Sequence, residues 1–252
     1  MRYLKLKIAY DGTDFHGWQV QPGLPTIQGL LQSVLADIEG RPVPVHGAGR
    51  TDAGVHALAQ VASVELSNPI PADNLRKAMN RWLPDAVRVV AVEEVTADFH
   101  PRHRAKAKTY EYRIWRGEVC PPFLSRYVYP HPYPLDELAM MEAAPRFEGT
   151  HDFRSLAAAN APGKESTVRT IFSSTLERKE ALLVYRVRGS GFLHHMVRNI
   201  VGVLLDVGRD ATLPADVDTI IAARQRSAAG PTVPGRGLFL VEVEYGTGEE
   251  QQ

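Results

Sequence analysis

The chain runs Gly47-Ala48-Gly49-Arg50-Thr51-Asp52-Ala53-Gly54-Val55-His56-Ala57 between two strand-like segments. Three glycines surround one carboxylate and one guanidinium group, and so much glycine is unfavourable inside a helix or a strand. The pattern predicts a loop that presents Asp52 on a turn, with Arg50 two residues away. Asp52 is therefore a candidate catalytic carboxylate; the alternative is an aspartate that only caps its own turn.

The segments around this loop form a regular order. Leu4, Leu6 and Ile8 fall on one face of a strand, and Thr26 and Gly40 are typical start and stop residues of a helix. The predicted elements are strands at 2–10, 42–46, 59–66 and 87–95 and helices at 26–39 and 71–82. This order, β-α-β-β-α-β, is that of a split βαβ, ferredoxin-like unit.

A similar order follows in the second part of the chain. The predicted elements are strands at 109–115, 168–176, 181–189 and 238–245 and helices at 135–147, 194–207 and 214–224. The helix at 194–207 is apolar nearly all round, so we expect it to be buried. The predicted fold class is α+β, with two ferredoxin-like halves, mainly antiparallel sheets and a shared central cleft. We expect an N-terminal half at 1–100, a C-terminal half at 101–246 and a polar tail at 247–252.

Composition excludes several classes of protein. The 252 residues are 44% hydrophobic and 23% charged, enough to bury a core. No apolar run approaches the roughly 18–20 residues that cross a bilayer. The single cysteine, Cys120, provides neither a disulfide framework nor a thiolate metal cluster. Because the chain enters a strand pattern at once, we expect no leader peptide, no membrane association and a cytoplasmic location.

The net charge is zero, but basic residues are concentrated in one segment. This segment contains Arg102, Arg104, Lys106, Lys108, Arg113 and Arg116, interleaved with Tyr110, Tyr112 and Trp115. Cations attract phosphates, and aromatic rings stack on exposed bases. The segment predicts contact with nucleic acid; the alternative is a solvated basic face.

Four motifs are spaced along the chain. They are Tyr10–Gln19 with Thr26–Gly29, then Gly49–His56, Lys108–Tyr112 and Gly191–Asn199, with weaker echoes at Gly149–Phe153 and Gly237–Leu238. Together they resemble the tRNA pseudouridine synthase A family, from residue 3 to about residue 245. The resemblance implies the pseudouridine synthase fold and an isomerase, acting as a homodimer, that converts uridine to pseudouridine in the anticodon stem-loop of tRNA, at tRNA positions 38 to 40.

The resemblance also implies roles for three residues. Asp52 is the catalytic residue, and its chemistry leaves two roles open: nucleophile at C1′ of the ribose or base at C2′. Tyr110 lies against the target uracil, although its pattern alone is that of a packing residue. Arg198 forms an ion pair with Asp52. An unpaired guanidinium on an apolar helix would be costly, so a structural pair with an acid such as Asp206 is the alternative.

Four basic residues are candidates for contact with RNA. The possible RNA contacts are Arg50, Arg104, Lys106 and Lys108. The isomerisation involves no redox change or group donor, so we expect no cofactor and no metal. His194 and His195 are adjacent on a helix and would diverge, which is unfavourable for a shared metal ion. Two other functions compete: a non-enzymatic tRNA-binding module with two RRM-like halves, and a metal-free hydrolase using Asp52 and His56.

Overall fold

The computed structural model describes residues 1–159 and 166–246, and the chain forms two compact units. The first contains Met1–Lys106 and the chain from Phe239 onward, and the second contains Ala107–Leu238. The sequence predicts that the closing strand at 238–245 belongs to the C-terminal half. In the structure this strand groups with the first unit, where it pairs with the strand that follows the Asp52 loop. The predicted polar tail at 247–252 lies outside the described residues.

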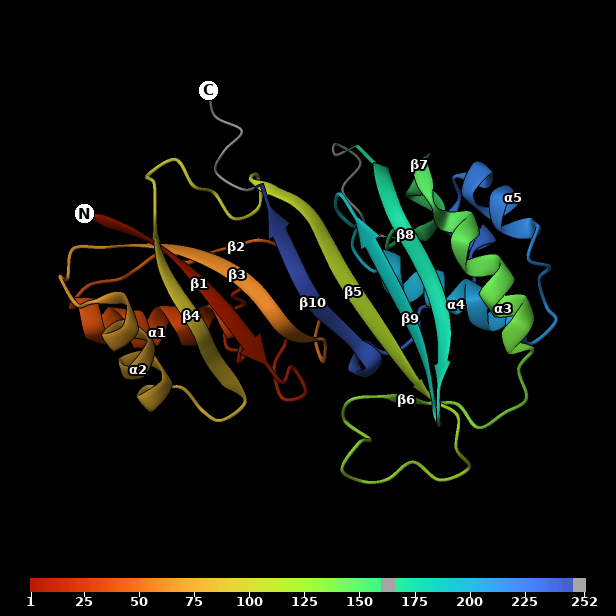
Figure 1. Ribbon diagram of the computed structural model, residues 1–252, viewed down its shortest axis with the longest axis horizontal. Helices are drawn as coiled ribbons and strands as arrows, with labels where there is room; N and C mark the ends of the chain where they lie inside the picture. The colour runs from red at the N-terminus through yellow and green to blue at the C-terminus, as the bar shows by residue number, and fades with distance from the viewer. Residues whose placement is uncertain (160–165, 247–252) are drawn as a thin grey trace. The chain divides into compact units, whose positions relative to one another are not determined.

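The first unit is a mostly antiparallel sheet with two helices (Figure 1). Its elements are β1 (Arg2–Tyr10), α1 (Ile27–Glu39), β2 (His46–Gly47), β3 (His56–Leu66), α2 (Ala72–Trp82), β4 (Val87–Val95) and β10 (Leu238–Tyr245). The strands are ordered β4-β1-β3-β10, and β2 also pairs with β3. The parallel pairing of β10 with β3 falls at His56 and Ala57, so β10 fixes the end of the Asp52 loop.

The first helix begins and ends as its sequence predicts. The Thr26 side chain accepts a hydrogen bond from the Gly29 amide, and Gly40 ends the helix with a φ of 76°. Leu31 and Leu35 are fully buried. The predicted caps of α1 are therefore confirmed.

The predicted strand at 42–46 is wrong in extent. Only His46–Gly47 pairs with β3, although Val43 and Val45 are buried. Pro42 and Pro44 carry no amide hydrogen, so this segment cannot form a full ladder of backbone hydrogen bonds. The alternating apolar pattern here indicates burial rather than a strand.

The second unit contains an antiparallel sheet and three helices (Figure 1). Its elements are β5 (Ala105–Trp115), β6 (Tyr129–Pro130), α3 (Glu137–Ala143), β7 (Gly149–Asp152), β8 (Val168–Lys179), β9 (Leu182–Gly189), α4 (Met196–Gly208) and α5 (Asp216–Ala223). The strands are ordered β5-β9-β8-β7, and β6 pairs with β5 in parallel. Helices α3 and α4 pack against each other.

The three predicted helices of this unit differ from the observed ones at their ends, and α5 spans Asp216–Ala223 rather than 214–224. The helix expected at 135–147 is α-helical only to Ala143 and continues as a short 3₁₀ helix, because Pro145 disrupts the α-helical hydrogen bonds. Helix α4 starts at Met196 rather than 194, because His195 has a left-handed conformation with φ 64°. Eleven of the 13 residues of α4 are buried, which confirms the predicted burial. No helix among the described residues has the length and apolar character to cross a membrane.

Helix α4 lies very close to the backbone of another segment at Gly202. A Cβ atom on Gly202 would lie 2.1 Å from the carbonyl oxygen of Pro231, a distance that no side chain can accept. Glycine thus lets α4 approach the backbone of the segment that precedes β10.

We expect Gly202→Ala to lower the free energy of unfolding by up to about 2 kcal/mol. Overpacking a close contact costs about 1–3 kcal/mol, and the higher helix propensity of alanine offsets about 1 kcal/mol of that cost. Urea denaturation measures the change. Gly208→Ala is the matched control in the same helix, because its Cβ would meet the movable side chains of Met140 and Leu135. If Gly208→Ala lowers the free energy of unfolding more than Gly202→Ala does, the proposed importance of the Pro231 contact is contradicted.

Candidate active site

Asp52 lies on a tight turn that closes through the backbone. The Val55 amide donates to the Asp52 carbonyl oxygen at 3.1 Å, and Gly54 takes a φ of 73° that other residues rarely adopt. Asp52 is half-buried, whereas Val55 and His56 are buried. The hydrogen bond that closes the turn uses the Asp52 carbonyl oxygen as its acceptor.

A second segment, residues 12–18, supports this turn by direct backbone contact. A Cβ atom on Gly12 would lie 2.0 Å from the Val55 carbonyl oxygen, and one on Gly17 would lie 2.5 Å from that of Thr51. The Trp18 amide donates to the same Thr51 oxygen at 3.0 Å. The glycines of the first motif therefore allow it to pack directly against the Asp52 loop.

Buried polar groups hold the start of the loop. The hydroxyls of Tyr10 and Thr51 are 2.8 Å apart, and the Gln60 amide donates to the Gly49 carbonyl oxygen at 3.0 Å. Burial raises the pKa of Tyr10 to about 12, so its hydroxyl stays neutral. Gln60 was not among the predicted site residues, although a polar side chain within an apolar strand was a visible signal.

His56 is a buried structural residue. Its Nδ1 atom lies 3.1 Å from the Gly12 amide and 3.2 Å from the Asp11 carboxylate, and its ring stacks on Phe239. Only 1% of its surface is exposed. These contacts weigh against the hydrolase alternative, which required His56 to reach a substrate.

Tyr110 lies on β5 in the second unit and is buried. Its ring meets the edge of Phe192 with the centroids 5.1 Å apart. This contact joins the motif on β5 to the motif at Gly191–Asn199 within one unit. Strand alternation places Lys108 and Tyr110 on the same face of β5.

Arg198 lies on the first turn of α4 and is half-buried. Its Nε atom donates to the Val233 carbonyl oxygen at 2.7 Å. Asp206, the acid considered as its structural partner, forms an ion pair with Arg209. Arg198 and Tyr110 thus belong to the second unit, and Asp52 belongs to the first.

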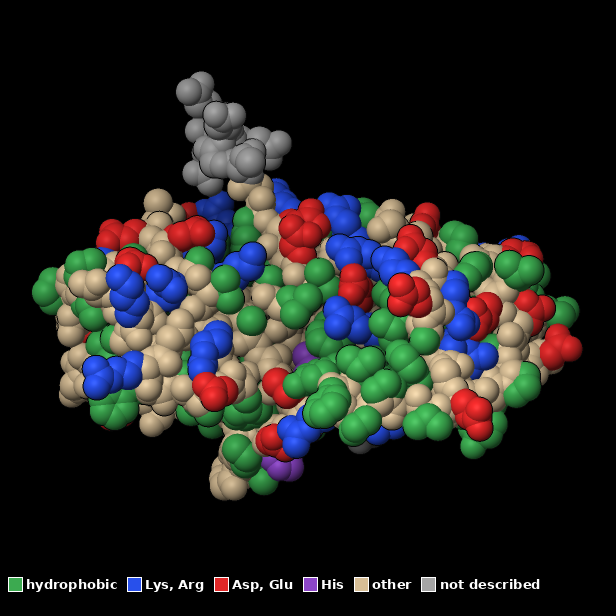
Figure 2. All heavy atoms as spheres, turned by 60° about the horizontal axis from the view of Figure 1, so that its bottom comes forward, with side chains coloured by type: hydrophobic (Ala, Val, Ile, Leu, Met, Phe, Trp, Pro, Cys, Tyr) green, Lys and Arg blue, Asp and Glu red, His purple; other side chains and the backbone are tan. Residues whose placement is uncertain are grey.

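The predicted RNA contacts differ in exposure from the later basic residues of the basic segment. Arg50, Arg104 and Lys106 are exposed and Lys108 is half-buried, with Arg104 paired to Asp98. The later basic residues are structural: Arg113 and Arg186 pair with Glu111, and Arg116 pairs with Glu137. On the face drawn in Figure 2, basic and acidic side chains are interspersed, in keeping with the zero net charge.

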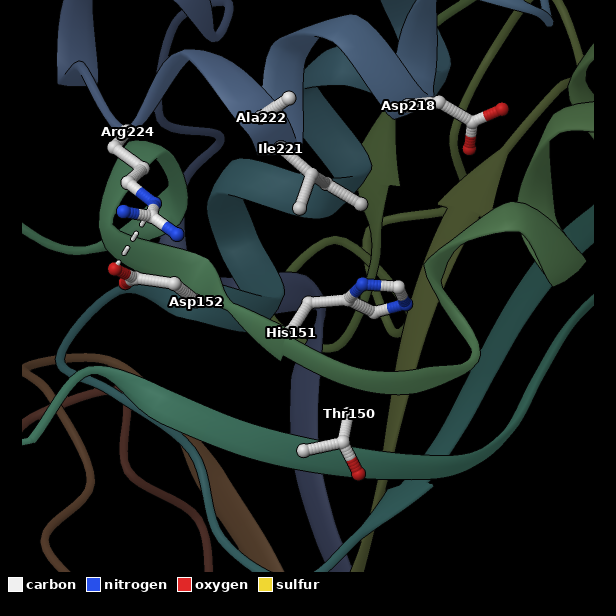
Figure 3. A pocket seen from close by; sticks show the side chains of 7 residues that line it. All are labelled: Thr150, His151, Asp152, Asp218, Ile221, Ala222 and Arg224. Carbon is white, nitrogen blue, oxygen red and sulfur yellow. Dashed lines mark ion pairs between the residues drawn. The ribbon is translucent and has the colours of Figure 1, made fainter.

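A separate hollow of about 450 Å³ lies between β7 and α5 in the second unit (Figure 3). Its lining residues are Thr150, His151, Asp152, Asp218, Ile221, Ala222 and Arg224. The charged groups here are paired within the protein: Arg224 lies 3.3 Å from Asp152, and Arg146 lies 3.0 Å from Asp218. Asp152 also accepts a hydrogen bond from Thr167. We therefore assign the motif at Gly149–Phe153 a structural role.

The chain matches known proteins over most of its length. A family model described as tRNA pseudouridine synthase matches residues 7–103 and 143–246. The tRNA pseudouridine synthase A of Solibacter usitatus is 59% identical, covering 97% of this chain and 100% of that protein. The proteins of the same name from Halalkalibacterium halodurans and Geobacillus kaustophilus are 46% and 44% identical, covering 95% and 96% of this chain and 91% and 94% of their own lengths. This chain therefore belongs to the tRNA pseudouridine synthase family.

Proposed function

We propose that this protein converts uridine to pseudouridine in tRNA, with Asp52 as the catalytic residue. The observation that carries the proposal is the rigid turn that presents the half-buried Asp52 within a motif of the family. The reaction breaks the bond between N1 of uracil and C1′, turns the base and joins C5 to C1′. It has no net redox change and no group donor. Asp52 acts either as nucleophile at C1′ or as base at C2′.

The supports around Asp52 suit either role. A nucleophile or a base must be held close to the reacting atom in a fixed orientation, and a displacement of about 1 Å can cost 100-fold in rate. The 12–18 segment and the Tyr10–Thr51 contact restrain both sides of the turn. Tyr110, held by Phe192, is proposed to lie against the target uracil.

Arg198 is proposed to form an ion pair with Asp52. A guanidinium group has five donors in one plane and binds a carboxylate in a bidentate manner. The hydrogen bond to Val233 occupies one donor and restrains the direction of that plane. The remaining donors are the ones proposed to orient Asp52 and to keep it charged when RNA fills the site.

The proposed substrate is the anticodon stem-loop of tRNA, at tRNA positions 38 to 40. A target base must leave its stack, which costs a few kcal/mol and requires a pocket that receives it. We propose that each unit is a split βαβ half, that the two halves share a cleft for this base, and that the protein acts as a homodimer in the cytoplasm. Arg50, Arg104, Lys106 and Lys108 are the proposed RNA contacts.

The reaction has a direct assay. Pseudouridine formation releases the hydrogen on C5, so tRNA labelled with tritium at C5 of uridine reports turnover without cleavage of the chain. A tRNA-binding module releases no tritium, and a hydrolase releases fragments. Absence of tritium release with anticodon stem-loop substrates would contradict the proposed function.

Asp52→Asn is expected to abolish tritium release while the affinity for tRNA stays within about threefold. The amide keeps the polarity that the turn needs but has no negative charge for the chemistry. Asp52→Ala is the companion variant because it cannot regain a carboxylate by deamidation. If Asp52→Ala turns over faster than about one-thousandth of the wild-type rate, Asp52 is not the catalytic residue.

Arg198→Lys is expected to lower kcat by at least about 100-fold with little change in tRNA affinity. Lysine keeps the charge but lacks the planar, bidentate donors. Single-turnover kinetics and filter binding separate the two effects. Arg209→Lys, at the residue that follows the same helix, is the control, because Arg209 pairs with Asp206. Equal effects of the two substitutions would argue against a special role for Arg198.

The combined replacement of Arg104, Lys106 and Lys108 by Gln is expected to weaken tRNA binding and to reduce its dependence on salt, because each phosphate contact contributes to the slope. Titrations between 50 and 200 mM salt measure both. Replacement of Arg76, Lys77 and Arg81 by Gln removes the same charge from α2 and serves as the control. If both triple variants bind alike, the basic segment is not a specific RNA contact.

A further inference from the structure

We propose that Tyr112 and Asn199 are positioning residues for Arg198, acting through the backbone of Thr232, Val233 and Pro234. These three consecutive residues are each held by a different side chain. The inference rests on the proposed role of Arg198 and extends it to two residues of the same motifs to which the resemblance gives no role. We call residues 232–234 the bracket segment.

Asn199 holds the first residue of the bracket segment. It is fully buried, and its Oδ1 atom accepts a hydrogen bond from the Thr232 hydroxyl at 2.6 Å. Its Nδ2 atom donates to the Leu156 carbonyl oxygen at 2.8 Å. Arg226 donates to both Asn199 and Thr232. A buried amide with this many partners fixes the segment relative to the first turn of α4.

Tyr112 holds the third residue. Its hydroxyl donates to the Pro234 carbonyl oxygen at 2.8 Å, and the tyrosine is fully buried. Burial raises the pKa of Tyr112, with a smaller contribution from Tyr129, so the hydroxyl remains a neutral donor. The charges of Arg198 and Arg236 act in the opposite direction on this pKa, by smaller amounts.

Arg198 binds the residue between these two. Its Nε atom donates to Val233, whose carbonyl orientation is set by the residues on either side. A shift of the bracket segment would turn the acceptor of Nε and with it the plane of the guanidinium group. Tyr112 on β5 and Asn199 on α4, both fully buried, therefore restrain Arg198 from two elements.

The chain offers a matched pair of tyrosines for a test. Tyr112 and Tyr185 face each other in the register of β5 and β9, and both are fully buried. The Tyr185 hydroxyl lies 2.8 Å from the Ser174 hydroxyl and, among the described residues, forms no hydrogen bond to the bracket segment. Tyr112→Phe and Tyr185→Phe thus each remove one buried hydroxyl from the same sheet.

We expect Tyr112→Phe to lower kcat about 10-fold with KM within about twofold, and Tyr185→Phe to leave both within about twofold. Thr232→Val, which removes the hydroxyl bound to Asn199 at nearly constant volume, should lower kcat in the same way. Single-turnover tritium release at saturating enzyme measures the chemical step. Equal kcat values for Tyr112→Phe and Tyr185→Phe would overturn the proposal.

A double-mutant comparison separates positioning from a general loss of structure. If Tyr112 acts through Arg198, Tyr112→Phe should reduce kcat by less than twofold when Arg198 is already lysine. A full 10-fold further loss would show that Tyr112 acts by another route. If Arg198→Lys itself retains wild-type kcat, the proposed catalytic role of Arg198 fails.

A spectroscopic measurement tests the positioning independently of activity. The ¹⁵Nε–¹H signal of Arg198, assigned by its loss in Arg198→Lys, should exchange slowly with solvent in the wild-type protein because Val233 accepts that hydrogen. We expect exchange at least fivefold faster in Tyr112→Phe and Thr232→Val and unchanged in Tyr185→Phe. Unchanged exchange in Tyr112→Phe and Thr232→Val would overturn the proposal whatever the kinetics show.

Discussion

The first unit depends on the backbone-to-backbone contact between the 12–18 segment and the Asp52 loop. Gly12 and Gly17 leave no room for side chains between the two segments, and a hydrogen bond from Trp18 to Thr51 joins them. Polar contacts below the turn, such as that between Tyr10 and Thr51, need this close approach in order to form. The two motifs of this unit are therefore a single structural object, in which one segment carries Asp52 and the other holds it in place.

In the second unit, a candidate site residue is held by a side-chain hydrogen bond instead of by close backbone packing. Arg198, which is proposed to act with Asp52, lies on a helix that is buried almost completely. The backbone carbonyl of Val233 accepts a hydrogen bond from its Nε atom. The close packing of α4 at Gly202 brings the preceding residue 231 against the helix, so the same chain segment that receives Arg198 is pressed against the helix that carries it.

Much of this was predictable from periodicity and caps. The limits of β1, β4 and β10 agree with the patterns at 2–10, 87–95 and 238–245, because alternation of apolar residues is a local property. The prediction of a strand at 42–46 was wrong because alternating apolar residues indicate burial, and a buried segment need not pair with a strand. The roles of Gln60 and Asn199 were not predicted, since an amide in an apolar element shows that a partner is needed without showing which one. The proposed pairing of Asp52 with Arg198 joins two units and is likewise a matter of tertiary structure.

The parallel pairing of β10 with β3 has a consequence for the order of folding. The strand that completes the first unit is near the C-terminal end of the described chain, whereas the rest of that unit lies before residue 107. During synthesis His56, at the end of the Asp52 loop, can pair with Phe239 only after the chain has been made beyond residue 238. Non-local strand pairing of this kind is slow, and an unpaired strand edge is prone to association with other chains. The second unit, continuous in sequence, has no such delay and can fold before the first is complete.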